Sequence, residues 1–174
     1  MELTDIMRHR RSVRSYTNQP LSEDELKTIL EAGLLSPSGR NIKPCEFIVV
    51  TDKSMLLTLA GARTGAADML KNAAAAIAVI SDESRTDTYI EDASIAMSNM
   101  HLMADSLGLG SCWIQGRGRE SSDGSTTEEY VRSLLHFPEN MRLIAILSLG
   151  HTESHPDSRG LTESDLEKVH YSQY

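Results

Sequence analysis

Residues 89–116 have the sequence YIEDASIAMSNMHLMADSLGLGSCWIQG, which predicts the longest helix of the chain followed by a strand. From residue 89 to residue 107, apolar side chains recur at the spacing of a helix, and Gly108 supplies a C-terminal stop. Apolar residues surround much of this helix, so it is expected to be buried on more than one side, centrally in the monomer or between two subunits. Residues 111–115 then predict a strand.

Helices and strands alternate on both sides of this stretch. Helices are predicted over residues 4–10, 22–33, 54–60 and 126–136, and two of them begin with capping boxes, Ser22 with Glu25 and Thr126 with Glu129. Residues 45–51 and 75–81 predict buried strands, and residues 143–149 predict the last strong strand. This alternation predicts an α/β or α+β sandwich in which helices cover the faces of a sheet, with the strand order left open.

Bulk properties restrict the class of protein. The chain has 174 residues, of which 40% are apolar, so a single domain over residues 1–174 is expected. Its net charge of −8 argues against nonspecific binding to nucleic acid or anionic lipid. No apolar run approaches the roughly 20 residues that cross a bilayer, and no secretion signal precedes the first helix, so a cytoplasmic protein without membrane contact is expected. Residues 150–174 lack a core pattern, which predicts a tail that is disordered or pinned against a partner.

A basic cluster occupies the end of the first predicted helix. It consists of Arg8, Arg10, Arg11 and Arg14, interleaved with Ser12 and Ser15. Guanidinium groups suit phosphate because they donate two parallel charge-assisted hydrogen bonds. Taken alone, the cluster favours a solvated basic face or intrachain salt bridges to the many carboxylates over an anion site.

Two further stretches carry polar or glycine-rich sequence. Residues 36–44, SPSGRNIKP, present hydroxyls, an amide and a lysine between prolines, which suits hydrogen bonding to the edge of a planar heterocycle or a simple connection. Residues 107–116 contain glycines that permit close backbone approach to a ligand. They match neither the dinucleotide fingerprint, which needs a preceding strand, nor a nucleophile elbow.

Together these motifs resemble the nitroreductase family of FMN enzymes. The resemblance rests on residues 10–16 (RRSVRSY), 36–44 (SPSGRNIKP), 99–114 (NMHLMADSLGLGSCWI), and an ending with Arg159 and residues 169–171 (VHY). They occur in the order and spacing of the family over nearly the whole chain. The resemblance implies an α+β fold of three layers, with a central, mostly antiparallel sheet flanked by helices, and an interlocked homodimer with FMN at the subunit interface.

The same resemblance implies a set of cofactor-binding residues. By family position, Arg10, Ser12 and Arg14 would hold the phosphate, ribityl chain and pyrimidine edge of FMN, and Arg159 would also reach the phosphate. Ser38 and Asn41 would come from the other subunit, and Gln115 and Gly116 would lie against the flavin near its reactive N5 edge. The complete set of candidates is Arg10, Arg11, Ser12, Arg14, Pro37, Ser38, Asn41, Lys43, Gln115, Gly116 and Arg159.

The implied chemistry belongs to the cofactor. Flavin N5 takes hydride from NADH or NADPH and passes it to a nitroaromatic, quinone or related acceptor in a ping-pong cycle, so the protein needs no nucleophile. Arg14 is the candidate for stabilising negative charge near N1 and O2 of the reduced flavin. Other flavin chemistry on the same fold, such as reductive dehalogenation or enone reduction, and a flavin-binding module without turnover are the alternatives.

The chain departs from the family pattern in two places. Its loop has Asn41-Ile42-Lys43-Pro44-Cys45 where the family usually has Asn, any residue, Gln, Pro, Trp, so Lys43 adds a cation. Only residues 82–88 separate a strand from the long helix, where larger members insert a helix over the flavin, so the lid is expected to be reduced or built elsewhere.

No metal site is expected from the sequence. His151 and His155 have helical spacing, but Pro156 favours a loop and no third ligand is nearby in sequence. Cys45 and Cys112 each lie in an apolar stretch and are expected to be buried, reduced thiols. The methionines of residues 97–103 are expected to pack in a core or a dimer interface rather than to bind copper.

Overall fold

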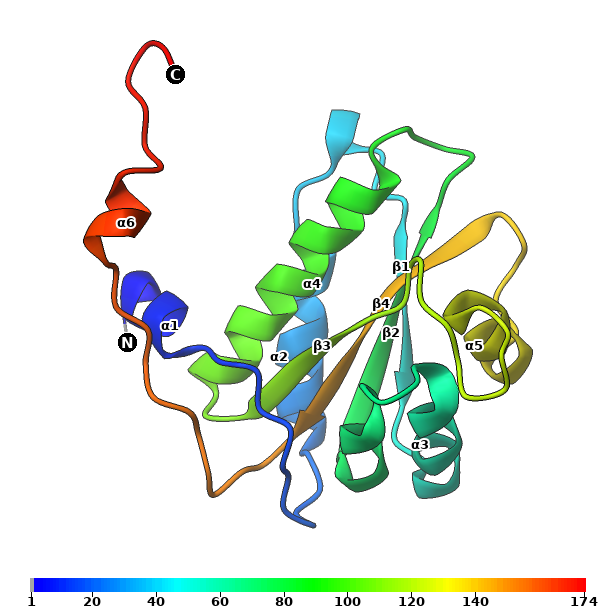
Figure 1. Cartoon of the computed structure of the whole chain (residues 1–174). Coiled ribbons are helices and arrows are strands. Elements are labelled where there is room, and N and C mark those ends of the chain that lie inside the picture. The colour runs from blue at the N-terminus through cyan, green and yellow to red at the C-terminus, as the bar shows by residue number, and fades with distance from the viewer. Residues whose placement is uncertain (1) are drawn as a thin grey trace.

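A four-stranded antiparallel sheet forms the middle layer of the protein, with helices on both of its faces (Figure 1). The computed structural model describes residues 2–174. The strands are β1 (Cys45–Val50), β2 (Ala75–Asp82), β3 (Gly110–Gln115) and β4 (Met141–Gly150), and their order in the sheet is β1-β2-β4-β3. All three strand pairs are antiparallel, so the prediction of an antiparallel sheet between helical layers is confirmed.

Helices α2 (Glu23–Leu34) and α4 (Tyr89–Ser106) cover one face of the sheet. The core on this face includes Met97 and Met100 of α4, packed against Ile77 and Leu147 of the sheet, and all four side chains are fully buried. Helix α2 begins with the predicted capping box, in which Ser22 and Glu25 satisfy each other's backbone N–H groups. The predicted long helix therefore places Met97 and Met100 in the core, whereas Met103 is half-buried.

The other face is covered by α3 (Lys53–Leu59), α5 (Thr127–Leu135) and the 3-10 turns η2 (Ala60–Ala62) and η3 (Asp68–Asn72). Leu56, Leu70 and Val131 from these elements pack on Ile114 and Leu143 of the sheet, and each is buried. The second predicted capping box, Thr126 with Glu129, opens α5. Each face of the sheet thus has its own apolar core.

Residues 45–50 form a strand as predicted, but the prediction that this strand is buried is wrong. Within residues 2–174, strand β1 pairs only with β2 and lies at the edge of the sheet. Of its residues, only Val50 is buried. Cys45, at its start, is half-buried for the same reason, whereas Cys112 of β3 is buried. Strands β2 and β4 are buried almost throughout, because they lie in the middle of the sheet between both helical layers.

The segment that follows α1 (Leu3–His9) lies directly on the ends of two strands. Val13 donates its backbone N–H to the carbonyl of Ser111 at 2.9 Å. A Cβ at Gly110 would lie 2.6 Å from Val13 Cγ1, and one at Gly150 would lie 2.9 Å from the ring of Tyr16, so glycine is required at both positions for this approach. The sheet therefore fixes the position of the basic cluster.

Residues 151–174 form an arm that leaves β4, passes α1 and carries the short helix α6 (Glu163–Leu166) at a distance from the sheet (Figure 1). Every residue of the arm is half-buried or exposed, and Tyr171 is 87% exposed. The backbone N–H of Arg159 donates to the carbonyl of Arg8 at 2.8 Å. The arm therefore contacts Arg8 of α1 through Arg159, fifteen residues before the last residue of the chain. Within residues 2–174, no helix is long and apolar enough to span a membrane.

Candidate functional site

Arg10 is held by a buried histidine of α4. Its guanidinium donates to Nε2 of His101 at 2.8 Å, and Nδ1 of His101 lies 2.5 Å from Oγ of Ser111. Because a guanidinium only donates, Nε2 must accept, so the proton of the neutral ring is on Nδ1 and is donated to Ser111. Burial, and next the charge of Arg10, lower the pKa of His101 to about 4. A neutral partner thus orients Arg10 without neutralising its charge.

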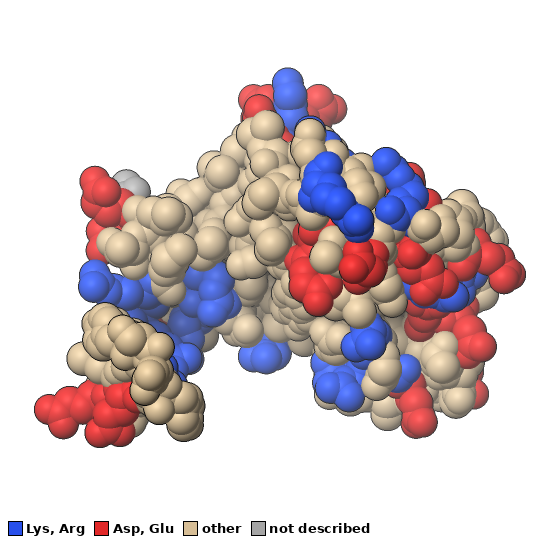
Figure 2. Space-filling view, turned by 90° about the horizontal axis from the view of Figure 1, so that it is seen from above, with Lys and Arg blue, Asp and Glu red and all other residues tan. Residues whose placement is uncertain are grey.

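Three arginines in this part of the structure have no carboxylate partner among the described residues. Among the ion pairs of residues 2–174, none involves Arg10, Arg14 or Arg63, although the chain is acidic overall. Arg8, by contrast, lies 3.5 Å from Asp5. The salt-bridge alternative therefore applies to Arg8 but not to Arg10 or Arg14. Figure 2 shows basic side chains gathered where the arm meets the body.

A cavity of about 390 Å³ lies beside β3 and contains two of these cations. Arg14 and Arg63 line it together with Trp113 and the buried Cys112. Burial raises the pKa of the Cys112 thiol, which keeps it protonated and inert. Asp68 also lines the cavity, but its carboxylate pairs with Lys71. The two arginines and the aromatic wall therefore suit a planar anionic ligand.

The end of β3 presents an oriented amide. Trp113 donates its indole N–H to Oε1 of Gln115 at 2.9 Å, and Nε2 of Gln115 donates to the carbonyl of Arg117 at 3.1 Å. These two bonds determine which side of the amide faces which neighbour. Gly116 is buried, and a Cβ there would lie 2.9 Å from Leu143, so close packing alone requires glycine at this position.

The 36–44 loop has a strained backbone. Arg40, Asn41 and Lys43 have φ values of 53°, 56° and 51°, in the left-handed region that costs a non-glycine residue on the order of 1 kcal/mol or more. The Lys43 backbone N–H donates to Ser38 Oγ at 2.8 Å and holds the loop in this shape. Strain retained in an exposed polar loop is typical of a ligand-binding segment.

This loop is attached to the opposite end of α4 from Arg10. Gly39 donates its N–H to the buried carboxylate of Asp92 at 2.8 Å, near the beginning of α4, whereas His101, the partner of Arg10, lies near its end. Nine residues of helix separate these two attachment points by roughly 14 Å along the helix axis. One copy of the chain therefore does not bring the loop residues Pro37, Ser38, Asn41 and Lys43 to the arginine cluster.

Comparison with known proteins identifies the family. A model of the nitroreductase family matches residues 7–64 and 53–151. The chain belongs to the nitroreductase family. A family member from Archaeoglobus fulgidus, provisionally named NADH dehydrogenase/NAD(P)H nitroreductase, is 37% identical over 152 residues, which are 85% of this chain and 84% of that protein.

Solved structures of nitroreductases have the same fold. An FMN-dependent nitroreductase from Clostridium difficile superposes with a TM-score of 0.92 at 39% identity, covering 98% of this chain and 99% of that one. A provisionally named nitroreductase from Desulfovibrio desulfuricans, solved in complex with FMN, has a TM-score of 0.78 at 27% identity and covers 98% of both chains. The α+β architecture expected from the resemblance is therefore confirmed.

In this nitroreductase, the side chains of Arg11 and Arg159 both contact residues of the arm. The Arg11 guanidinium donates to the backbone carbonyl of Asp157. Arg159 lies beside the end of α1 through its backbone, but its exposed guanidinium lies 3.6 Å from Asp165 of α6. The structure thus brings the Arg159 backbone to the basic cluster, whereas its guanidinium pairs with Asp165 of the arm.

Sequence reasoning missed His101, Asp92 and Arg63. His101 is a single polar side chain on the apolar face of a predicted helix, and Asp92 lies in the first turn of the same helix, where an acidic residue has an ordinary dipole role. Burial was the missing information, since His101 is only 6% and Asp92 only 4% exposed. Arg63 lies in an irregular loop after η2, so periodicity gave no signal for it.

Proposed function

We propose that this nitroreductase is a cytoplasmic FMN-dependent oxidoreductase that passes hydride from NADH or NADPH through the flavin to a nitroaromatic, quinone or similar electron-poor acceptor. The observation that carries the proposal is the cluster of Arg10, Arg14 and Arg63, which pair with no carboxylate among the described residues of an acidic chain. Family membership supplies the cofactor class, because similar proteins are named for FMN and NAD(P)H.

In the proposed site, the residues on each side of β3 have different roles. Arg10 and Ser12 bind the phosphate and ribityl chain, since Arg10 is already oriented by His101. Arg14 stabilises negative charge at the pyrimidine edge, and Arg63, which shares its cavity, adds a second cation there. Bound FMN would supply the hydride chemistry at N5, and we assign the amide of Gln115, which Trp113 orients, to that edge.

The arm residues have secondary tasks in this assignment. Arg159 would reach the phosphate after its exposed guanidinium leaves Asp165, which keeps Lys168 as an ion-pair partner at 2.8 Å. Arg11 remains with Asp157 and holds the arm in place.

The proposed active form is a homodimer in which the 36–44 loop of one subunit completes the site of the other. A groove of about 270 Å³ between α1, α2 and α4 is lined mainly by apolar residues: Leu3, Ile6, Ala32, Leu35, Leu102 and Met103. Leu35 is 76% and Leu3 is 58% exposed, and apolar surface of this extent supports coverage by a second copy. Analytical ultracentrifugation should show a dimer, and a monomer at micromolar concentration would contradict the shared site.

The proposed activity is tested by the spectrum and the reduction kinetics of the purified protein. The preparation should be yellow and should release stoichiometric FMN on denaturation. Stopped-flow mixing with NADH or NADPH should then bleach the oxidised flavin absorbance, and an added quinone should restore it. A yellow protein that neither nicotinamide nucleotide reduces would indicate a flavin-binding module, and a colourless protein indifferent to added FMN would end the proposal.

Lys43→Gln should lower the flavin midpoint potential. In the proposed dimer the partner's loop places this exposed cation near the flavin, where it stabilises the negative charge of the reduced form. An interaction of roughly 1 kcal/mol corresponds to a decrease of about 20 mV for a two-electron couple. Redox titration measures the shift, and Lys27→Gln on the exposed side of α2 is the matched control. Equal potentials in the two variants would refute the role of Lys43.

A further inference from the structure

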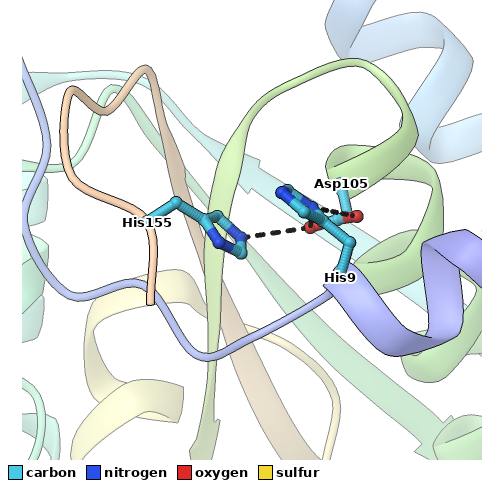
Figure 3. A group of neighbouring side chains, drawn as sticks. All are labelled: His9, Asp105 and His155. Atoms are coloured by element: carbon cyan, nitrogen blue, oxygen red, sulfur yellow. Dashed lines mark hydrogen bonds and ion pairs between the residues drawn. The ribbon is translucent and has the colours of Figure 1, made fainter. Parts of the chain in front are cut away.

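We propose that His9, Asp105 and His155 form a binding site for a divalent transition-metal ion of the zinc class. Each residue offers one ligand atom, and these atoms all lie within 4.8 Å of one another (Figure 3). Nδ1 of His9 lies 3.0 Å from both carboxylate oxygens of Asp105, and Nε2 of His155 lies 3.3 Å from Oδ1. The site goes beyond the flavin chemistry and does not depend on it.

Three separate segments contribute these ligands. His9 is the last residue of α1, Asp105 lies in the last turn of α4, and His155 belongs to the arm. The expectation that the histidines form no metal site considered His151 and His155, which the structure separates: Nε2 of His151 lies 3.6 Å from Glu25 instead. The cluster could not be found from spacing, because folding alone brings its members together.

The charge of Asp105 requires a positive partner. Its side chain is only 3% exposed, and among the described residues its polar side-chain partners are the two imidazoles, with no lysine or arginine. A buried carboxylate is costly unless a cation compensates it. In addition, Nε2 of His155 is buried and, although it lies 3.3 Å from Oδ1 of Asp105, it has no partner with hydrogen-bond geometry within residues 2–174. A metal ion bound to all three side chains would satisfy both groups.

The donor set determines the kind of metal. Two imidazole nitrogens and one carboxylate oxygen suit Zn²⁺, Co²⁺ or Ni²⁺, with water at the remaining position, whereas Mg²⁺ and Ca²⁺ prefer oxygen ligands alone. The last turn of α4 adds the partial negative charge of a helix C-terminus, which also favours a cation. The rings of His9 and His155 are stacked with centroids 4.0 Å apart, so coordination requires them to rotate until both nitrogens point to the ion.

Metal binding would fasten the arm to the body. Two and four residues after His155, the arm already contacts the basic segment through the Asp157 carbonyl and the Arg159 backbone N–H. A bond from His155 to an ion held by α1 and α4 would add a strong link to these weak contacts. The site is therefore structural in character, with a measurable effect on stability.

Isothermal titration calorimetry with ZnCl₂ tests the site on untagged, full-length protein washed with chelator. The wild type should bind one Zn²⁺ per chain at micromolar concentration, and His155→Ala should weaken binding at least about tenfold, as loss of a ligand does. His170→Ala is the matched control, because His170 is an exposed histidine of the same arm outside the cluster. The control should bind Zn²⁺ like the wild type.

Thermal unfolding gives a second measurement. Added Zn²⁺ should raise the unfolding midpoint of the wild type and of His170→Ala but not that of His155→Ala. Because His155 lies on the half-exposed arm, its replacement leaves both apolar cores intact. Failure of the wild type to bind Zn²⁺, or equal binding by the wild type and His155→Ala, would overturn the proposal.

Discussion

Arg10→Ala is expected to weaken FMN binding by more than tenfold. A hydrogen bond to a charged group contributes about 1.5–3 kcal/mol, and Arg10 is proposed to make such bonds with the phosphate. The substitution also leaves Nε2 of the buried His101 without its donor. Titration of apoprotein with FMN, followed by the quenching of flavin fluorescence, measures the change in dissociation constant.

Two further variants separate the charge of Arg10 from its shape. Arg8→Ala removes a nearby arginine that is paired with Asp5 and should leave the affinity for FMN unchanged. Arg10→Lys keeps the charge but loses the planar guanidinium, so its affinity should lie between those of the wild type and Arg10→Ala. An unaltered dissociation constant in Arg10→Ala would remove the phosphate assignment, while leaving the Zn²⁺ site untouched.

His101 is expected to make the protein less stable as the pH falls from 6.5 to 4. Burial lowers its pKa from 6.5 to about 4 in the folded chain, so in this interval the unfolded chain takes up a proton that the folded chain does not. The contribution is fully present above pH 6.5 and is lost progressively down to pH 4. The shift corresponds to a loss of up to about 3 kcal/mol in the free energy of unfolding.

His101→Gln isolates this contribution from those of other titrating groups. The Gln side chain retains an acceptor for Arg10 but does not take up a proton, so its stability should fall less between pH 6.5 and 4.5 than that of the wild type. Urea denaturation at several pH values gives both curves, and the carboxylates common to the two proteins cancel in their difference. Parallel curves would show that His101 does not control this interval.

Much of the fold could be predicted because local signals and core patterns agreed. The capping boxes at Ser22 and Thr126 placed the starts of two helices, and Gly108 placed the end of the longest one. The burial of β1 was misjudged because an apolar run has the same appearance in an edge strand as in a central one. The strand order determines whether a strand lies at the edge or in the middle of the sheet. Strands that are far apart in sequence pair only after folding, so neither strand's own sequence predicts the order.

The candidate site was only partly accessible from the sequence. The resemblance pointed to Arg10 and Arg14. That neither forms an ion pair could not be predicted, because it depends on where distant acidic residues lie after folding. The neutral partner His101 and the cavity partner Arg63 depend on burial in the same way. The cluster of His9, Asp105 and His155 joins positions up to 146 residues apart, and the contact between Arg11 and Asp157 spans the same distance in sequence. No local pattern predicts such contacts.

The position of β4 has a consequence for synthesis. It is the last strand to be made, yet β2 and β3 both use it as a neighbour, and β3 pairs with no other strand within residues 2–174. A nascent chain on the ribosome that has not yet reached Met141 therefore exposes one unpaired side of β2 and an isolated β3. Protection by chaperones is needed most in that interval, and premature termination before β4 should yield insoluble chains rather than a smaller folded protein.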